Sequence, residues 1–154
     1  MDKVIVGIDP GKSGAAVAIN QNMEVLSQFR FSTAEDGDLS DWLTDIWIDH
    51  GLEVIVVEMV HSMPGQGVKS TFSFGKSTGA IAEAVGLFSD EVTIRKPSPQ
   101  AWQRDLDCMT GGNKNITKDL AQKLFPDVKV IHANADALLL AEWGRREYFS
   151  NSLN

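Results

Sequence analysis

The sequence has few of the residues that build disulfides or membrane spans. Its one cysteine, Cys108, excludes an internal disulfide and any metal cage built from several thiolates, so we expect a bystander thiol in a reducing compartment. No apolar run approaches the roughly eighteen residues that a membrane-spanning helix needs. The first residues have neither a signal-peptide nor a transit-peptide pattern. We therefore expect a cytoplasmic protein with no membrane association.

Positive charge is also scarce, since the formal net charge is -7 at pH 7. This balance argues at first against a polyanionic partner. Its distribution is uneven, because residues 1–68 carry three basic and eleven acidic side chains, whereas residues 69–154 carry eleven basic and ten acidic ones. A local cationic stripe can neutralise phosphates even where the summed charge is negative. The alternative is that these basic side chains form an ordinary solvated surface.

The length and the hydrophobic pattern predict one α/β domain over residues 1–154. Short β-branched runs bounded by turn residues predict strands, and apolar residues at helical spacing predict helices. The expected strands are residues 3–9, 15–19, 25–31, 53–59 and 91–95, with a further extended segment at 128–131. The expected helices are residues 38–50, 71–87, 101–106, 117–125 and 134–148. This order predicts a mixed five-stranded sheet flanked by helices, whose first three strands form an antiparallel meander.

Three carboxylates lie where a folding argument would not place them. Asp9 ends the first strand, Glu58 lies within the apolar run of the fourth, and Asp136 interrupts the apolar stretch of the last helix. An isolated buried carboxylate is costly unless it is paired or bound to metal. Each acid alone has a structural explanation, as a turn former, a buried ion pair or a helix-start acid. Together they favour a site, because the first and fourth strands are natural neighbours and a helix laid across them would add the third acid.

Clustered carboxylates repel one another, and a divalent cation is the simplest group that neutralises them. Hard oxygen ligands suit Mg²⁺ or Mn²⁺, which keep waters and bind substrate phosphate. Two such ions can activate a water and stabilise the leaving oxygen of a phosphoryl displacement. The residues therefore predict a metal-dependent phosphodiesterase site without a defined substrate.

Five motifs follow one another along the chain: GIDPGKSGAA at 7–16, VVEMVHSMPGQG at 56–67, PSPQAWQRDL at 97–106, KNITKDLAQKLFP at 114–126 and NADALLLAEWG at 134–144. In this order they resemble the RuvC-like Holliday junction resolvases, and phage and organellar members most of all. The resemblance spans nearly the whole chain. GIDPG alone would be a weak signal, whereas the ordered combination is specific.

The resemblance implies an RNase H-like fold and a homodimer that binds a four-way DNA junction. Each subunit would use acidic residues and Mg²⁺ or Mn²⁺, with two ions per site, to nick one of two symmetry-related strands and leave 5′-phosphate ends. Asp9, Glu58 and Asp136 match the acids of the first strand, the fourth strand and the last helix. The expected source is a phage or a bacterium.

The sequence departs from the familiar bacterial pattern beside Asp136. A fourth ligand usually stands one turn before the last acid, where this chain has Ala133, with His132 four positions back. Residues i and i+4 share a helix face, so His132 is a candidate ligand or water-positioning group; alternatively it ends a preceding strand outside the helix. Lys114 matches a lysine that lies near the scissile phosphate in organellar relatives, and the alternative is a surface lysine in a loop. Lys118 is a weaker candidate for the same role or for a DNA-backbone contact.

The segment 61–69 corresponds to the part of the family that meets the junction centre, or else is an ordinary strand-to-helix connection. The helix after it contributes to the dimer interface in relatives, or else simply packs on the sheet. The candidate DNA contacts are His61, Met63, Gln66, Lys69, Lys76 and Lys118.

Three other functions are compatible with parts of the sequence. GIDPGKSG also resembles the first phosphate loop of the sugar-kinase, actin and Hsp70 superfamily, but those proteins need two such lobes to clamp ATP. A related RNase H-like nuclease would act on other branched DNA or on structured RNA. A catalytically silent junction-binding protein would have no need of all three acids.

Overall fold

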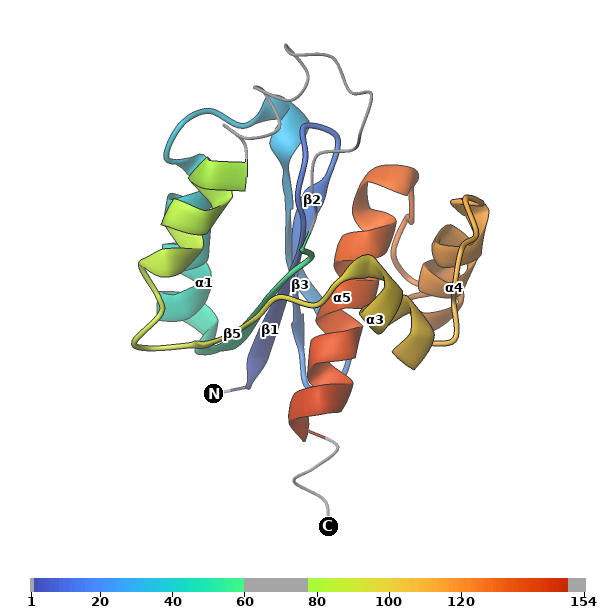
Figure 1. The fold of residues 1–154 in the computed structure, drawn as a ribbon. Coiled ribbons are helices and arrows are strands. Elements are labelled where there is room, and N and C mark those ends of the chain that lie inside the picture. The colour runs from blue at the N-terminus through green and yellow to red at the C-terminus, as the bar shows by residue number, and fades with distance from the viewer. Residues whose placement is uncertain (1, 60–77, 150–154) are drawn as a thin grey trace.

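The computed structural model describes residues 2–59 and 78–149, which form a five-stranded sheet with helices on both faces (Figure 1). The strands are β1 (Val4–Asp9), β2 (Ala15–Asn20), β3 (Val25–Arg30), β4 (Leu52–Val57) and β5 (Thr93–Arg95). The helices are α1 (Asp38–His50), α3 (Pro99–Asp105), α4 (Asn115–Leu124) and α5 (His132–Phe149), with the 3-10 turn η1 (Phe31–Thr33) and a helical segment at 78–86. The mixed α/β sheet predicted from the sequence is confirmed.

The strand order is β3-β2-β1-β4-β5, with β1 in the centre. β1, β2 and β3 form the predicted antiparallel meander, whereas β4 runs parallel to both β1 and β5. Ile8 of β1 pairs with Val57 of β4. Asp9, the last residue of β1, and Glu58, the first residue after β4, therefore lie at the same end of the two strands.

Each face of the sheet has its own apolar core. α5 lies across β1, β2 and β4 with α4 and α3 packed against it, while α1 and the segment 78–86 cover the opposite face (Figure 1). β1 and β2 are buried on both faces, which explains their nearly continuous apolar sequences. Among the described helices, we find none with the length and apolar character to cross a membrane.

Two glycines allow α5 to lie close to the sheet. A Cβ added at Gly7 would collide with the backbone of Ala137 and Ala141, and one at Gly144 would stand 2.6 Å from a methyl group of Val56. Backbone atoms of a packed helix cannot yield locally, so the whole helix would have to move. The close approach fixes where α5 begins relative to the end of β1, and hence where Asp136 lies.

We expect Gly7→Ala to lower the free energy of unfolding by at least about 2 kcal/mol, because the added methyl group overpacks a rigid interface. Urea unfolding followed by circular dichroism measures this change. Gly86→Ala is the matched control, because a Cβ at Gly86 meets no heavy atom within 4 Å. A Gly7→Ala protein as stable as the Gly86→Ala protein would contradict the proposed contact.

The segment at 128–131, for which the sequence predicts an extended run, is not paired into the sheet. Side chains supply the backbone hydrogen bonds there that a neighbouring strand would otherwise make. The Gln122 amide donates to the Val128 carbonyl at 2.9 Å and accepts from the Val130 N–H at 3.3 Å. Asn134 accepts from the Ile131 N–H at 2.9 Å. The segment is thereby satisfied as an irregular connection.

Candidate active site

The three predicted acids meet at the carboxyl-terminal edge of β1 and β4. Asp9 is the last residue of β1, and Glu58 directly follows β4, held beside β1 by a 3.1 Å hydrogen bond from its N–H to the Ile8 carbonyl. Asp136 lies one turn into α5, next to Ala137, whose backbone lies against Gly7 of β1. Glu58 is 8% exposed, and the other two acids are half-buried. Elements far apart in sequence thus bring one carboxylate each.

The charges of these acids act on one another. The pKa of Asp9 is raised from 3.8 to about 8. Burial is the largest cause, and the negative charges of Asp136 and Glu58 come next. Burial and the charge of Asp136 also raise the pKa of Glu58, and burial raises the pKa of Asp136. Such mutual effects require short separations in a poorly solvated place. The acids therefore form one electrostatic cluster, referred to below as the carboxylate cluster.

The donor chemistry of the carboxylate cluster fits Mg²⁺ or Mn²⁺, because its oxygens are hard ligands and its negative charge exceeds the positive charge near it. Within residues 2–59 and 78–149, no group of three or more His, Cys, Asp or Glu side chains is already arranged to hold an ion. The chemistry of the donors therefore supports an ion at the cluster, and Mg²⁺ or Mn²⁺ binding there stays a prediction.

The positive charge of Lys114 acts on the carboxylate cluster, and its side chain does not cap α4. It is the N-cap residue of α4 but makes no side-chain capping bond, and a cation at this end opposes the helix dipole. Its charge lowers the pKa of both Asp9 and Asp136. The structure thus places this lysine at the carboxylate cluster, at the end of a loop in which Gly111 and Gly112 have positive φ angles.

His132 is the first residue of α5, so the alternative that it ends a preceding strand is wrong. Its side chain is exposed and lines a hollow of about 490 Å³ together with residues 112–115. Its charge contributes to lowering the pKa of Asp136, four residues further along the helix. His132 is therefore within electrostatic reach of the cluster, and its role as a metal ligand stays a prediction.

Thr117 is a site residue that the sequence reading missed. Its side chain is buried on α4, and a hydrogen bond from its hydroxyl holds the pKa of Asp136 down against the effect of burial. In the structure this hydroxyl donates a 3.2 Å hydrogen bond to the Lys114 carbonyl. Because it has one proton, it can donate to an ionised Asp136 only by releasing that carbonyl. Threonine in an amphipathic helix gave no sequence signal for this contact.

Trp102 was also missed, although it lies in a motif that carried the resemblance. Its fully buried indole donates a hydrogen bond of 2.6 Å from Nε1 to Oε2 of Glu58. The available signal was a lone large apolar residue in the otherwise polar helix PQAWQRD, since a buried indole N–H needs an acceptor.

The predicted DNA contacts are mostly outside the described residues. This holds for His61, Met63, Gln66, Lys69 and Lys76. Lys118 lies half-buried on α4, one turn after Lys114. The structure therefore bears on only one member of this predicted set.

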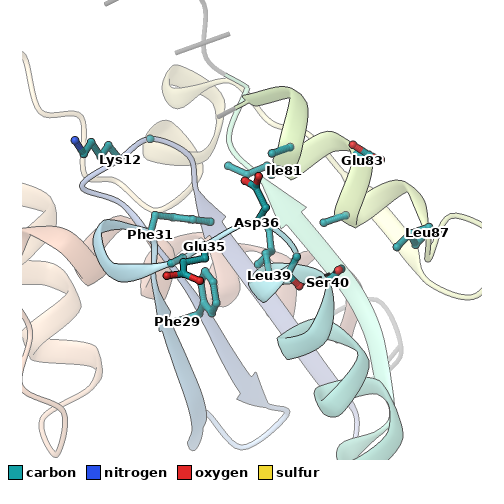
Figure 2. Close-up of a pocket in the computed structure, with 15 residues that line it drawn as sticks. Lys12, Phe29, Phe31, Glu35, Asp36, Leu39, Ser40, Ile81, Glu83 and Leu87 are labelled. Atoms are coloured by element: carbon teal, nitrogen blue, oxygen red, sulfur yellow. Dashed lines mark hydrogen bonds between the residues drawn. The ribbon is translucent and has the colours of Figure 1, made fainter. Parts of the chain in front are cut away.

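Two pockets, called hollows here, lie on the face of the sheet that α1 and the segment 78–86 cover, opposite to α5. The wider one, of about 630 Å³, lies between Phe29, Phe31 and the start of α1 on one side and Ile81 and Leu87 on the other (Figure 2). None of the three clustered acids lines it. A smaller hollow of about 280 Å³ is lined by Pro10, Glu58 and Lys96 among others. The smaller hollow therefore reaches Glu58, whereas Asp9 and Asp136 line neither hollow.

Cys108 lies in the apolar core near the cluster and is 2% exposed. Burial, followed by the charges of Asp136 and Asp107, raises the pKa of its thiol to about 11. A protonated, buried thiol is a poor nucleophile and a poor ligand. The side chain packs as a small apolar residue.

No protein-family model and no curated protein matches the sequence. Solved structures do match it. RuvC of T. thermophilus, both in complex with a Holliday junction substrate and as a separate structure, aligns with a TM-score of 0.64 and 16% identity over 97% of this chain and 96% of RuvC. The yeast mitochondrial Holliday junction resolvase Ydc2 aligns with a TM-score of 0.52 and 13% identity over 96% of this chain and 82% of Ydc2. The chain therefore has the RNase H-like α/β fold of the RuvC-type Holliday junction resolvases.

Proposed function

We propose that the protein is a metal-dependent endonuclease that resolves four-way DNA junctions by paired nicking. The observation that carries this proposal is the meeting of Asp9, Glu58 and Asp136 at one edge of a sheet whose fold is shared with RuvC and Ydc2. The RuvC match is to a complex with a Holliday junction substrate. The proposed products carry 5′-phosphate and 3′-hydroxyl ends.

The three carboxylates would hold one or two Mg²⁺ or Mn²⁺ ions, with His132 as a further ligand or as a group that orients water. When bound, such ions lower the pKa of a bound water and stabilise the leaving oxygen of an in-line displacement. Lys114 faces the same acids from α4 and would balance negative charge on the phosphate under attack. The nearby cations Lys12 and Lys96, both exposed, would contact flanking phosphates.

Paired nicking needs two sites related by symmetry, because a four-way junction presents two equivalent strands. One chain supplies one carboxylate cluster, so we propose a homodimer in which each subunit cuts one strand. The predicted junction-centre residues His61, Met63 and Gln66 and the lysines Lys69, Lys76 and Lys118 complete this proposal as DNA contacts.

A cleavage panel tests the function directly. The protein is incubated with a synthetic four-way junction, a replication fork, a matched duplex, single-stranded DNA and a structured RNA, each with Mg²⁺ and with EDTA. Paired symmetric nicks in the junction, present only with the metal, are the expected result. Preferential cutting of the fork or the RNA would support a related nuclease instead. Metal-independent junction binding without cleavage would indicate a silent junction-binding protein.

We expect Lys114→Ala to slow junction nicking by about 10- to 100-fold, because a cation that stabilises developing phosphate charge is lost. Lys123→Ala is the matched control, since Lys123 is an exposed lysine of the same helix, in its last turn. Single-turnover rates on a labelled junction measure the effect. Equal rates for the two variants would exclude a role of Lys114 in the chemistry.

A further inference from the structure

Three hydrogen bonds hold Glu58 and its neighbour Met59 in place. Two of them come from residues 97–102, a segment that has no role in the proposed function. The Glu58 N–H donates to the Ile8 carbonyl at 3.1 Å, and the N–H of the next residue, Met59, donates to the Pro97 carbonyl at 2.8 Å. Trp102 Nε1–H donates to Glu58 Oε2 at 2.6 Å across 44 positions of sequence. The segment therefore holds both the backbone and the carboxylate at this position.

The helix that carries the indole is itself fixed at both ends. Ser98 caps α3 by accepting a 3.2 Å hydrogen bond from the Ala101 N–H, and a proline opens the helix. At the other end, Trp143 Nε1–H of α5 donates to Asp105 Oδ2 at 2.9 Å. Trp102 is 0% exposed, so its ring has no room to swing. The N–H is thus a rigid donor.

The two carboxylate oxygens of Glu58 have different surroundings. Among the described residues, the Trp102 indole is the only side-chain donor to this carboxylate, and it contacts Oε2. No buried side-chain oxygen or nitrogen of the described residues lacks a partner, so Oε1 is not sealed in the core. Glu58 also lines the hollow of about 280 Å³ that Pro10 and Lys96 border. Within residues 2–59 and 78–149, Oε2 is therefore bonded to the Trp102 indole, and Oε1 has no hydrogen-bond donor and can take a ligand.

We propose that Trp102 is a positioning residue that fixes the Glu58 carboxylate so that Oε1 faces the divalent ion. An indole N–H donates and cannot accept, so it suits a carboxylate acting as a ligand. Groups that orient a metal ligand from behind change metal affinity or activity by about 10- to 100-fold when they are removed. The inference rests on the proposed function for the divalent ion at the carboxylate cluster, and does not depend on which nucleic acid is cut.

Trp102→Phe removes the donor and keeps an aromatic ring. Trp42→Phe is the matched control, because it removes an indole hydrogen bond, from Trp42 Nε1–H to Ser27 Oγ at 2.8 Å, that has no part in holding α3 or Glu58. We expect Trp102→Phe to raise the Mg²⁺ concentration for half-maximal nicking by about 10- to 100-fold, with junction affinity in EDTA unchanged. Trp42→Phe keeps the wild-type Mg²⁺ midpoint. An unchanged midpoint for Trp102→Phe, or equal shifts in both variants, would overturn the proposal.

Two readouts do not depend on cleavage. The Mg²⁺-induced rise in Tm should need a correspondingly higher concentration in Trp102→Phe than in Trp42→Phe. In the wild-type protein, ¹H–¹⁵N spectra resolve the indole N–H groups of the four tryptophans, and we expect Mg²⁺ to shift the Trp102 signal while those of Trp42 and Trp143 stay. A Trp102 signal unmoved by Mg²⁺ overturns the proposal without any variant. Absence of junction cleavage with these metal effects intact would refute only the proposed function.

Discussion

Asp9→Asn, Glu58→Gln and Asp136→Asn should each slow junction nicking by at least about 1,000-fold, because each removes one ligand of ions whose charge stabilisation amounts to several kcal/mol. Junction affinity in EDTA should be unchanged, since the proposed phosphate contacts are lysines. Single-turnover cleavage and gel-shift titration measure the two quantities separately. The substitutions are close in shape, so packing is preserved.

Asp45→Asn is the control for charge alone, because Asp45 is an exposed acid of α1 on the opposite face of the sheet. It should cut junctions at the wild-type rate. Loss of junction binding in the three cluster variants would mean that the acids are structural. Retained nicking in all three would remove the carboxylate cluster from the chemistry.

The stability of the metal-free protein should fall as pH rises from about 4 to about 8. Asp9 has a pKa of 3.8 when free and about 8 in the folded chain, where burial and the charges of Asp136 and Glu58 favour its protonated form. In this window the folded state holds a proton that the unfolded state has released, so raising the pH favours unfolding. The slope approaches 1.4 kcal/mol per pH unit at most, and the total is on the order of 5 kcal/mol.

Mg²⁺ should reverse this loss, because the ion and the proton compete for the same carboxylates. The rise in Tm on adding Mg²⁺ should therefore grow between pH 6 and pH 9. Thermal unfolding of wild type and Asp9→Asn at matched pH isolates the contribution of this acid, and Asp9→Asn should be the more stable protein at pH 9 without metal. A Mg²⁺ effect that is constant with pH would contradict the competition.

The strands and the three acids were predictable from local sequence. β1 and β4 read as apolar runs because both their faces are covered, and an acid at the end of such a run has no packing role. α1 has the predicted bounds, Asp38–His50, because apolar spacing and Gly51 define both its length and its end. Hydrophobic periodicity and the residues that end helices and strands were therefore enough to predict the elements that position the site.

The features that the sequence did not predict depend on contacts between segments that lie far apart along the chain. The hydrogen bond from Trp102 to Glu58 and the effect of Thr117 on the pKa of Asp136 connect residues that share no pattern in the sequence. Gln122 and Asn134 replace a strand as backbone partners, which hydrophobic pattern alone cannot reveal. Gly7 looks like any small residue in a strand until the backbone of α5 is placed against it.

Crystals of the protein soaked with Mn²⁺ test the central claim most directly, because anomalous scattering locates the ion without reference to activity. The account predicts anomalous density between the carboxylates of Asp9, Glu58 and Asp136, and its loss in Asp136→Asn crystals. Ordered Mn²⁺ elsewhere, for example at the acids Glu35 and Asp36 beside the wider hollow, with none at the carboxylate cluster, would contradict it.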